Sequence, residues 1–306
     1  MSTSSDDLAT GPGLIEALHR DSVVCVATKS KGEKSYLVQR QMRLGRRHAS
    51  SSSGSTEAQC IFDLYHSYMR SPIEHSQGLP VNAITIPLCS TTGFTVDDAY
   101  LNDNGVPFLI VDFVCTNEQV VRIIPMPPPD LYPNAPSRRE SLLESTDLLP
   151  RFFVDADGTV GVPVDGPFDG IDPNRIFSST QRTSLKILFH WPNIPWDKKS
   201  STGQIQYRTT TGATGANGET SGGITISMRR AALLIAGAVA NFMRRAEESL
   251  QGQTDTAYPP WRIGTQPGQI RTSDVILMGA LFVSPGAAMP ILRLRDGFTI
   301  LWGDEI

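Results

Sequence analysis

The chain has 306 residues, which is enough for one large domain or two ordinary ones, and either can bury a hydrophobic core. Hydrophobic residues make up 40% and charged residues 19%, as in globular proteins, while 22 prolines and 26 glycines argue against an all-helical bundle. The formal net charge of -4 gives no general attraction to nucleic acid, so a nucleic-acid partner is not expected.

The first part of the chain is predicted to be a disordered tail over residues 1–13, followed by a β-rich part over residues 14–124. The tail is polar and acidic without a hydrophobic signal region, so we expect an intracellular protein, either cytoplasmic or nuclear. Ser22–Thr28 and Ser35–Arg40 flank a short polar loop, and this pattern predicts a β-hairpin. Gly45–Ser55 is basic and serine-rich, which predicts a flexible loop.

The middle of the chain is predicted to be rich in strands. Residues 56–69 place apolar side chains at helical spacing and predict a helix. Ala83–Leu88, Val106–Cys115 and Gln119–Ile124 are rich in β-branched or aromatic residues and predict strands. Residues 125–150 begin with a proline-rich run that cannot donate a regular ladder of hydrogen bonds, so we expect a crossover there.

The C-terminal part is assigned to residues 151–306. It opens with predicted short strands at Arg151–Val154 and Thr159–Val162, on either side of an Asp-Ala-Asp-Gly turn. Ser184–His190 predicts a further strand. Thr211–Gly223 is rich in threonine and glycine, which predicts a flexible loop before a long helix.

The strongest helix signal in the chain is Ser227–Leu250. Leu234 and Phe242 lie two turns apart with alanine, isoleucine and valine beside them, so a broad apolar face predicts a buried helix. Thr225 or Ser227 is placed to cap its free amides. The apolar run is too short, and too closely bracketed by arginines, to cross a membrane, so no membrane association is expected.

The residues after the helix complete the predicted fold. Val275–Val283 is a continuous apolar run and predicts a strand. Ile291–Arg295 and Phe298–Trp302 flank Asp296-Gly297, a pair typical of a type I′ hairpin turn. The chain is therefore predicted to be α+β and β-rich, with mainly antiparallel sheets and one long buried helix near the C-terminus. A single domain over residues 14–306 is the alternative to a division into two parts.

No catalytic, cofactor-binding or metal-ligating set is predicted. The cysteines are widely spaced without a CxxC pair, so we expect reduced, buried thiols. They are Cys25, Cys60, Cys89 and Cys115. Asp155, Asp157 and Gly158 resemble the start of a calcium loop, but the register of an EF-hand fails and a turn is expected instead. His66 and His75 have no partner motif, so they receive no acid–base role.

Two serines are predicted phosphorylation sites. Ser141 follows a pair of arginines and Ser50 follows an arginine by three positions, patterns that basophilic kinases prefer. Phosphate on Ser141 would add nearly two negative charges beside those arginines and would order the crossover.

Charge is also segregated along the chain, with eight Lys or Arg over residues 20–50 and thirteen Asp or Glu over residues 95–170. These regions are either solvated surfaces or complementary patches for self-association.

Three segments of the C-terminal third carry a resemblance to a known family: Leu188–Trp196, Met228–Met243 and Pro259–Leu294. They resemble an uncharacterised family of basidiomycete fungal proteins with a WPGY-like segment, a helix ending in an aromatic residue, a WxxG segment and an apolar strand in this order. Asn193 stands where that family usually has Gly, and Ala288 stands where it has Trp or Gln. Because the family has no established activity, the resemblance implies a source and not a function.

The leading interpretation is a non-catalytic intracellular binding or assembly module. Its partner would be another protein or a second copy, held by the flexible loops and the proline-rich crossover. The alternative is a viral coat or virion structural subunit with a jelly-roll-like β fold, whose nucleic acid would be a packaged genome. Against this alternative, the N-terminal arm lacks a dense basic run. A second alternative is an enzyme with a site assembled from distant residues.

Overall fold

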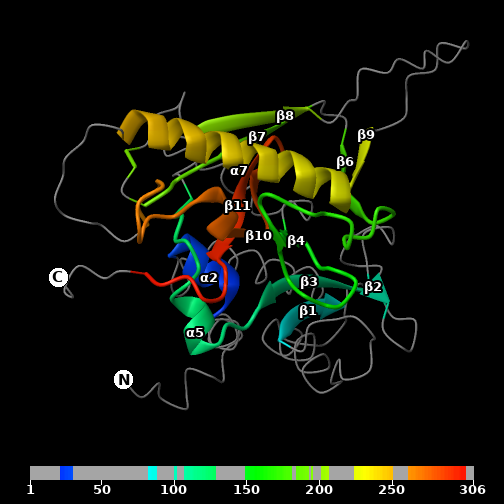
Figure 1. The fold of residues 1–306 in the computed structure, drawn as a ribbon. Helices are drawn as coiled ribbons and strands as arrows, with labels where there is room; N and C mark the ends of the chain where they lie inside the picture. The colour runs from blue at the N-terminus through cyan, green and yellow to red at the C-terminus, as the bar shows by residue number, and fades with distance from the viewer. Residues whose placement is uncertain are drawn as a thin grey trace, which may run out of the picture.

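The computed structural model describes residues 21–29, 82–87, 100–101, 107–128, 149–180, 184–192, 194–195, 201–206, 224–250 and 261–300. These residues form a sheet-rich mixture of strands and helices (Figure 1). The helices are α2 (Val23–Thr28), α5 (Asn117–Val120) and α7 (Met228–Leu250), with a 3-10 turn at Thr272–Asp274. The strands are β1 (Ala83–Pro87), β2 (Tyr100–Leu101), β3 (Pro107–Phe113), β4 (Arg151–Phe152), β5 (Val162–Pro163), β6 (Ile176–Thr180), β7 (Ser184–Leu188), β8 (Thr202–Gln206), β9 (Ile224–Ser227), β10 (Val275–Ser284) and β11 (Ala287–Leu294).

The largest sheet is built around the β10–β11 hairpin. Its strand order is β4-β10-β11-β7-β8. Strand β5 also pairs with β10, at Ile276 and Leu277, next to the residues that pair with β4. The β11–β7 pair is parallel, whereas every other strand pairing among the described residues is antiparallel. Two smaller sheets have the orders β1-β3-β2 and β6-β9. A sheet with a parallel pair and a helix on its face differs from the jelly roll expected for a coat subunit.

Strand β10 is buried on both faces, which explains the unbroken apolar run of its sequence. Leu277 and Ala280 belong to a core on one side of the sheet, and Met278 and Leu281 belong to a core on the other. A Cβ at Gly279 would lie 2.4 Å from the carbonyl oxygen of Arg151, so only glycine permits β4 to approach this closely. The strand predicted at Val275–Val283 is confirmed.

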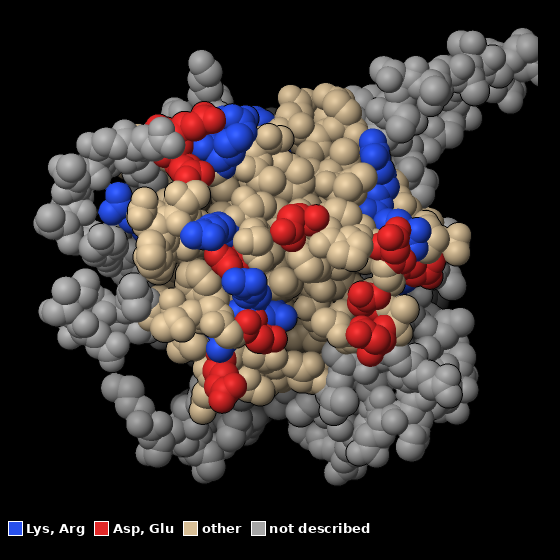
Figure 2. Space-filling model, in the orientation of Figure 1, with Lys and Arg blue, Asp and Glu red and all other residues tan. Residues whose placement is uncertain are grey.

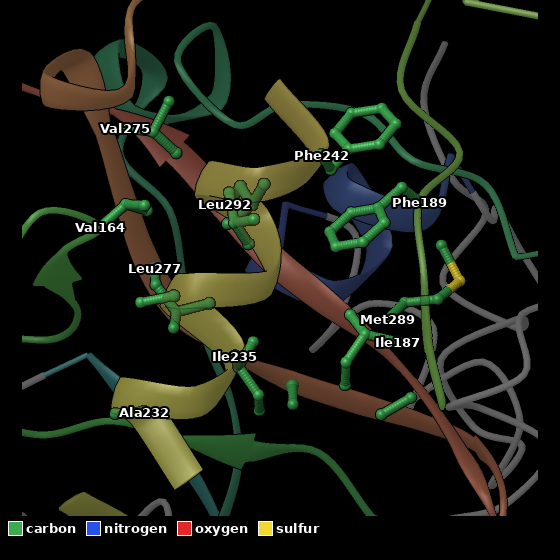
Figure 3. Packing of buried hydrophobic residues seen from close by; sticks show 14 of the residues in the cluster. Val164, Ile187, Phe189, Ala232, Ile235, Phe242, Val275, Leu277, Met289 and Leu292 are labelled. Atoms are coloured by element: carbon green, nitrogen blue, oxygen red, sulfur yellow. The ribbon is translucent and has the colours of Figure 1, made fainter. Parts of the chain in front are cut away.

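Helix α7 covers the first of these two cores. Its apolar side chains recur at helical spacing and pack on β6, β8, β9 and β10 (Figure 3). The fully or nearly fully buried ones are Met228, Ala231, Ala232, Ile235, Ala236, Val239, Phe242, Met243 and Ala246. The Oγ of Ser227 accepts a hydrogen bond of 3.3 Å from the amide of Arg230, so Ser227 caps the helix as predicted. The predicted helix is confirmed, and it is buried on one face only.

Aromatic residues fix the C-terminal half of α7. The rings of Phe242 and Phe189 stack with their centroids 4.5 Å apart, and Trp191 lies 6.1 Å from Phe242. The indole Nε1 of Trp191 donates a 2.7 Å hydrogen bond to the carbonyl oxygen of Trp261. Trp261 has a φ of 76°, a left-handed conformation unusual for a bulky residue. The segments after β7 and before β10 are therefore tied together under the helix.

The opposite face of the sheet is covered by α2 and β3, and here the predicted hairpin is wrong. Ser22–Thr28 contains a helix whose N-cap is Ser22, which accepts a bond from the amide of Cys25. The buried carboxylate of Asp112 accepts a 3.0 Å bond from the amide of Val24. Both contacts satisfy helix amides, and they outweigh the β preference of the valines. The partner strand predicted at Ser35–Arg40 lies outside the described residues.

The strand predicted at Gln119–Ile124 is also wrong over its first half. Thr116 and Gln119 form a capping box, in which each side chain accepts a bond from the backbone amide of the other. This local pairing starts the short helix α5. Only the end of the segment meets the sheet, where the amide of Ile124 donates a 2.9 Å bond to the carbonyl oxygen of Leu292.

The hairpin predicted around Asp296-Gly297 is wrong as well. Asp296 and Gly297 do form a turn, and Gly297 has a φ of 86°. The residues that follow pair with no strand in the described part; Phe298 and Ile300 instead pack against the core. The hairpin turn is at Pro285-Gly286, between β10 and β11.

The remaining strand predictions fall into two groups. Strands predicted at Ala83–Leu88, Val106–Cys115 and Ser184–His190 are confirmed by β1, β3 and β7. The short strands predicted from residue 151 to residue 162 are confirmed in part by β4, by β5 and by an isolated bridge between Val154 and Val160. The tail 1–13, the helix at 56–69, both flexible loops and most of the crossover lie outside the described residues.

The one-sided burial of α7 predicts losses of stability of very different size for substitutions at two nearby residues. Ile235 is 0% exposed and Leu233 is 44% exposed. Replacing Ile235 by Asp should lower the free energy of unfolding by about 4 kcal/mol or more, because a charge enters an apolar core. Leu233→Asp should cost less than about 1 kcal/mol. Urea denaturation of both variants checks this, and equal losses would contradict the assignment of faces.

Candidate interaction surface

The outer face of α7 is the candidate interaction surface; it comprises Arg230, Leu233, Leu234, Gly237, Ala240, Asn241, Arg244 and Glu248. These positions recur every three or four residues on the side away from the buried stripe; Leu234 and Ala240 lie at the edges of the face, since both are half-buried and pack against the core. No charged residue occurs from Ala231 to Met243, so the three middle turns of this face are neutral. A Cβ at Gly237 would meet no atom within 4 Å, so the centre of the face is open.

Charged residues occupy both ends of this neutral stretch. At the N-terminal end Arg230 is exposed. At the C-terminal end Arg244 and Glu248 form a 2.7 Å ion pair one turn apart, with side chains 60% and 57% exposed. Figure 2 shows charged groups at both ends of the helix and an acidic group beside its middle turns. An uncharged centre with a charged rim agrees with the usual pattern of protein–protein interfaces, in which charged residues are depleted at the core.

The helix that carries this face is held rigidly at both ends. The guanidinium of Arg229 donates bonds of 2.8 Å to the carbonyl oxygen of Ile171 and 2.6 Å to that of Asp169. Near the other end Arg245 donates to the carbonyl oxygens of Asn241 and Thr202. Because the helix is already fixed in the unbound protein, little conformational entropy would be lost when a partner binds to it.

Leu233 is one of three large hydrophobic residues that are exposed within the described part of the chain. The other two are Val114 and Val121, which lie beside α5. Single exposed hydrophobic residues are common on protein surfaces. Leu233 differs from these two because it borders the open, uncharged middle of a helix face, with Gly237 one turn after it and Arg230 one turn before it.

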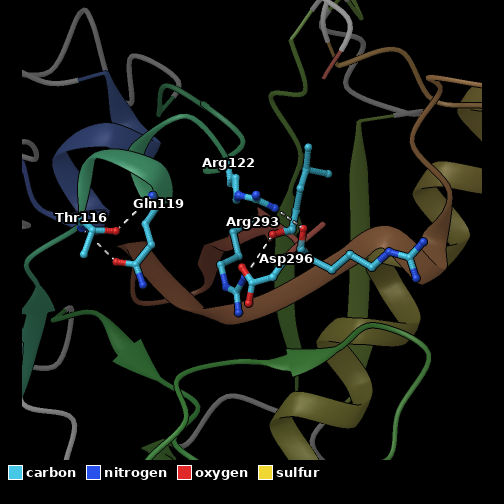
Figure 4. A network of polar contacts seen from close by, with 7 residues as sticks. Thr116, Gln119, Arg122, Arg293 and Asp296 are labelled. Carbon is cyan, nitrogen blue, oxygen red and sulfur yellow. Dashed lines mark hydrogen bonds and ion pairs between the residues drawn. The ribbon is translucent and has the colours of Figure 1, made fainter. Parts of the chain in front are cut away.

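A second polar cluster joins α5 to the end of β11 (Figure 4). Arg122 donates a 2.8 Å bond to the carbonyl oxygen of Arg295. Arg293 pairs with Asp296 at 3.1 Å, and Arg295 pairs with the buried carboxylate of Asp274 at 2.9 Å. Since all three guanidinium groups fasten neighbouring segments, the cluster has a structural role.

The acidic segment around Asp155 is a turn, as predicted. The amide of Gly158 donates a 2.9 Å bond to the carbonyl oxygen of Asp155, and Gly158 has a φ of 84°. The amide of Thr159 donates a 2.8 Å bond to the carboxylate of Asp157, and this lowers the pKa of Asp157. Within the described residues, no group of three or more His, Cys, Asp or Glu is placed to hold a metal ion.

The predicted phosphorylation sites, Ser141 and Ser50, lie outside the described residues, as do His66 and His75. Burial lowers the pKa of His190, and a hydrogen bond that its imidazole donates to the backbone carbonyl oxygen of Pro127 opposes that shift. In the described part of the chain, no helix is long and apolar enough to cross a membrane.

The outer face of α7 was missed by sequence reasoning, although a signal was present. The run Ala231–Ala240 looks apolar on all sides when it is read linearly. On a helical wheel, Gly237 and Asn241 share one face with Leu233 and the two flanking arginines. A glycine and an asparagine at the centre of one face indicate the side that the core does not use.

Comparisons with protein-family models, with curated proteins and with solved structures give no match to this chain. The resemblance to the basidiomycete family therefore stays a prediction.

Cys115 gives the chain a pH dependence at alkaline pH. Cys25 and Cys115 are buried, and Cys60 and Cys89 lie outside the described residues. Burial, assisted by the carboxylates of Asp112 and Asp21, raises the pKa of Cys115 from 9.0 to about 12. Above pH 9 the thiol ionises in the unfolded chain while it stays protonated in the folded one, so stability should fall as pH rises from 9 towards 12.

The measurement compares the wild type with Cys115→Ala in urea denaturation at several pH values from 8 upward. The effects of the other alkaline groups on stability are common to both proteins and cancel in the comparison. The remaining difference is due to the Cys115 thiol, so the wild type should lose stability more steeply. Parallel pH curves for the two proteins would contradict the buried thiol.

Proposed function

We propose that the chain is a non-catalytic intracellular binding or assembly module, cytoplasmic or nuclear, whose partner is a protein bound on the outer face of α7. The observation that carries the proposal is the neutral surface around Leu233 and Gly237, exposed between the charged ends of a rigid helix. Burial of this surface would remove apolar area from water without leaving a charge unpaired at its centre.

The physical cost of binding here is low for two reasons. The helix keeps its backbone hydrogen bonds to itself, and its buried stripe already anchors it to the core. Apart from Leu233 and Asn241, the middle of the face is formed by small or half-buried side chains, which lose little rotamer freedom on contact. Phosphorylation at Ser141 and Ser50 stays a prediction for the regulation of such a module.

A photo-crosslinking side chain placed at position 233 tests the proposal. Benzoylphenylalanine is introduced at Leu233 and, as a matched control, at Val121, which is 51% exposed beside α5. Purified protein and extracts of cells that naturally produce it are irradiated, and adducts are identified by mass spectrometry. We expect a specific polypeptide adduct from position 233 only. The absence of any adduct, or equal adducts from both positions, would contradict the proposal.

The same experiment bears on the alternatives. A coat subunit would crosslink to many copies within particles of very high mass, and light scattering with a 260/280 absorbance ratio would detect such particles with their nucleic acid. An enzyme would show no polypeptide adduct at position 233.

A further inference from the structure

We propose that the protein bound on the outer face of α7 is a second copy of this chain, paired antiparallel about a two-fold axis. The inference rests on the proposed function and names its partner. It is carried by the unequal charges at the two ends of this face, with Arg230 alone at one end and the ion pair of Arg244 and Glu248 at the other.

The charges select the direction of pairing. In a parallel pair Arg230 would face Arg230 of the second copy, and Glu248 would face its own counterpart, so like charges would oppose each other. In an antiparallel pair with Gly237 against Asn241 of the second copy, Arg230 lies against Glu248 of that copy. The two-fold axis repeats this contact, so one register forms two ion pairs.

The length of the helix allows both contacts at once. At 1.5 Å per residue, Arg230 and Glu248 lie about 27 Å apart along the helix axis. Two helices that cross at about 20° stay close enough over this length for long side chains to meet at both ends. Both residues are exposed. One carboxylate oxygen of Glu248 pairs with Arg244, and the other can accept a hydrogen bond from the guanidinium of Arg230 of the second copy.

The centre of the face permits close approach. Gly237 has open space where a side chain would be, so the partner helix can lie near its backbone. In the same register Leu234 lies against Arg244 of the second copy, whose aliphatic stem covers the leucine. The charge of Arg244 is already balanced by Glu248 at 2.7 Å, which reduces the cost of bringing it to the interface.

Charge reversal in trans tests the pairing. Arg230→Glu and Glu248→Arg are made separately, and self-association of each purified protein is measured by sedimentation velocity up to about 0.1 mM, where weak dimers form. Each variant alone should associate at least about tenfold more weakly than the wild type, because two like-charged contacts replace two ion pairs. A mixture of the two variants should recover the wild-type affinity, since each mixed pair restores both contacts.

Two further variants serve as controls. Glu118→Arg reverses an exposed charge on α5 and should leave association unchanged. Leu233→Glu should abolish association without a loss of folding, monitored by thermal denaturation and circular dichroism.

The outcomes separate this inference from the proposed function. A wild type that stays monomeric, or variants whose mixture does not recover, would overturn the antiparallel self-pairing. If position 233 then crosslinks to a different protein, the proposed function stands with another partner. If position 233 crosslinks to nothing, the proposed function fails too.

Discussion

The fold depends on the burial of the β10–β11 hairpin on both faces. Every residue from Val275 to Val283 is apolar or glycine, so neither face of β10 can be left in water. One face requires α7 and the other requires α2 with β3, while β4 and β5 pair with the free edge of β10. The hairpin therefore decides where both covering layers lie and joins N-terminal and C-terminal segments into one set of contacts.

The candidate surface follows from this arrangement. The sheet needs only one side of α7, and it takes the stripe that contains Ile235, Val239 and Phe242. The other side is left to solvent, with a neutral middle and charged ends. Arg229 and the Trp191–Trp261 hydrogen bond fix the helix and the segments below it, so the exposed face is presented in one orientation. The same helix thus stabilises the chain and offers a surface for a partner.

An element could be predicted from the sequence when the interactions that stabilise it follow from its own pattern of residues, and not when they come from residues far away in the chain. α7 and β10 were predictable, because their patterns of apolar residues extend over many positions and the core enforces them. α2 was not, because its stability depends on the carboxylate of Asp112, 88 residues away in the chain. α5 was missed although its capping box at Thr116 and Gln119 is local and visible. The final hairpin was misplaced because Asp296-Gly297 is a good turn, but the described residues that follow it, 298–300, pair with no strand. The face around Gly237 required knowledge of which side of α7 the sheet uses.

Hydroxyl-radical footprinting of α7 as a function of protein concentration tests the central claim most directly, namely that one side of the helix builds the core and the other receives a partner. The account predicts that Leu233 is oxidised readily in dilute protein and becomes protected as concentration rises. Phe242 and Met243, which are 2% and 1% exposed, should stay unreactive throughout. Rapid oxidation of Met243 would contradict the assignment of the core face, and a constant reactivity of Leu233 at all concentrations would contradict self-pairing through the outer face.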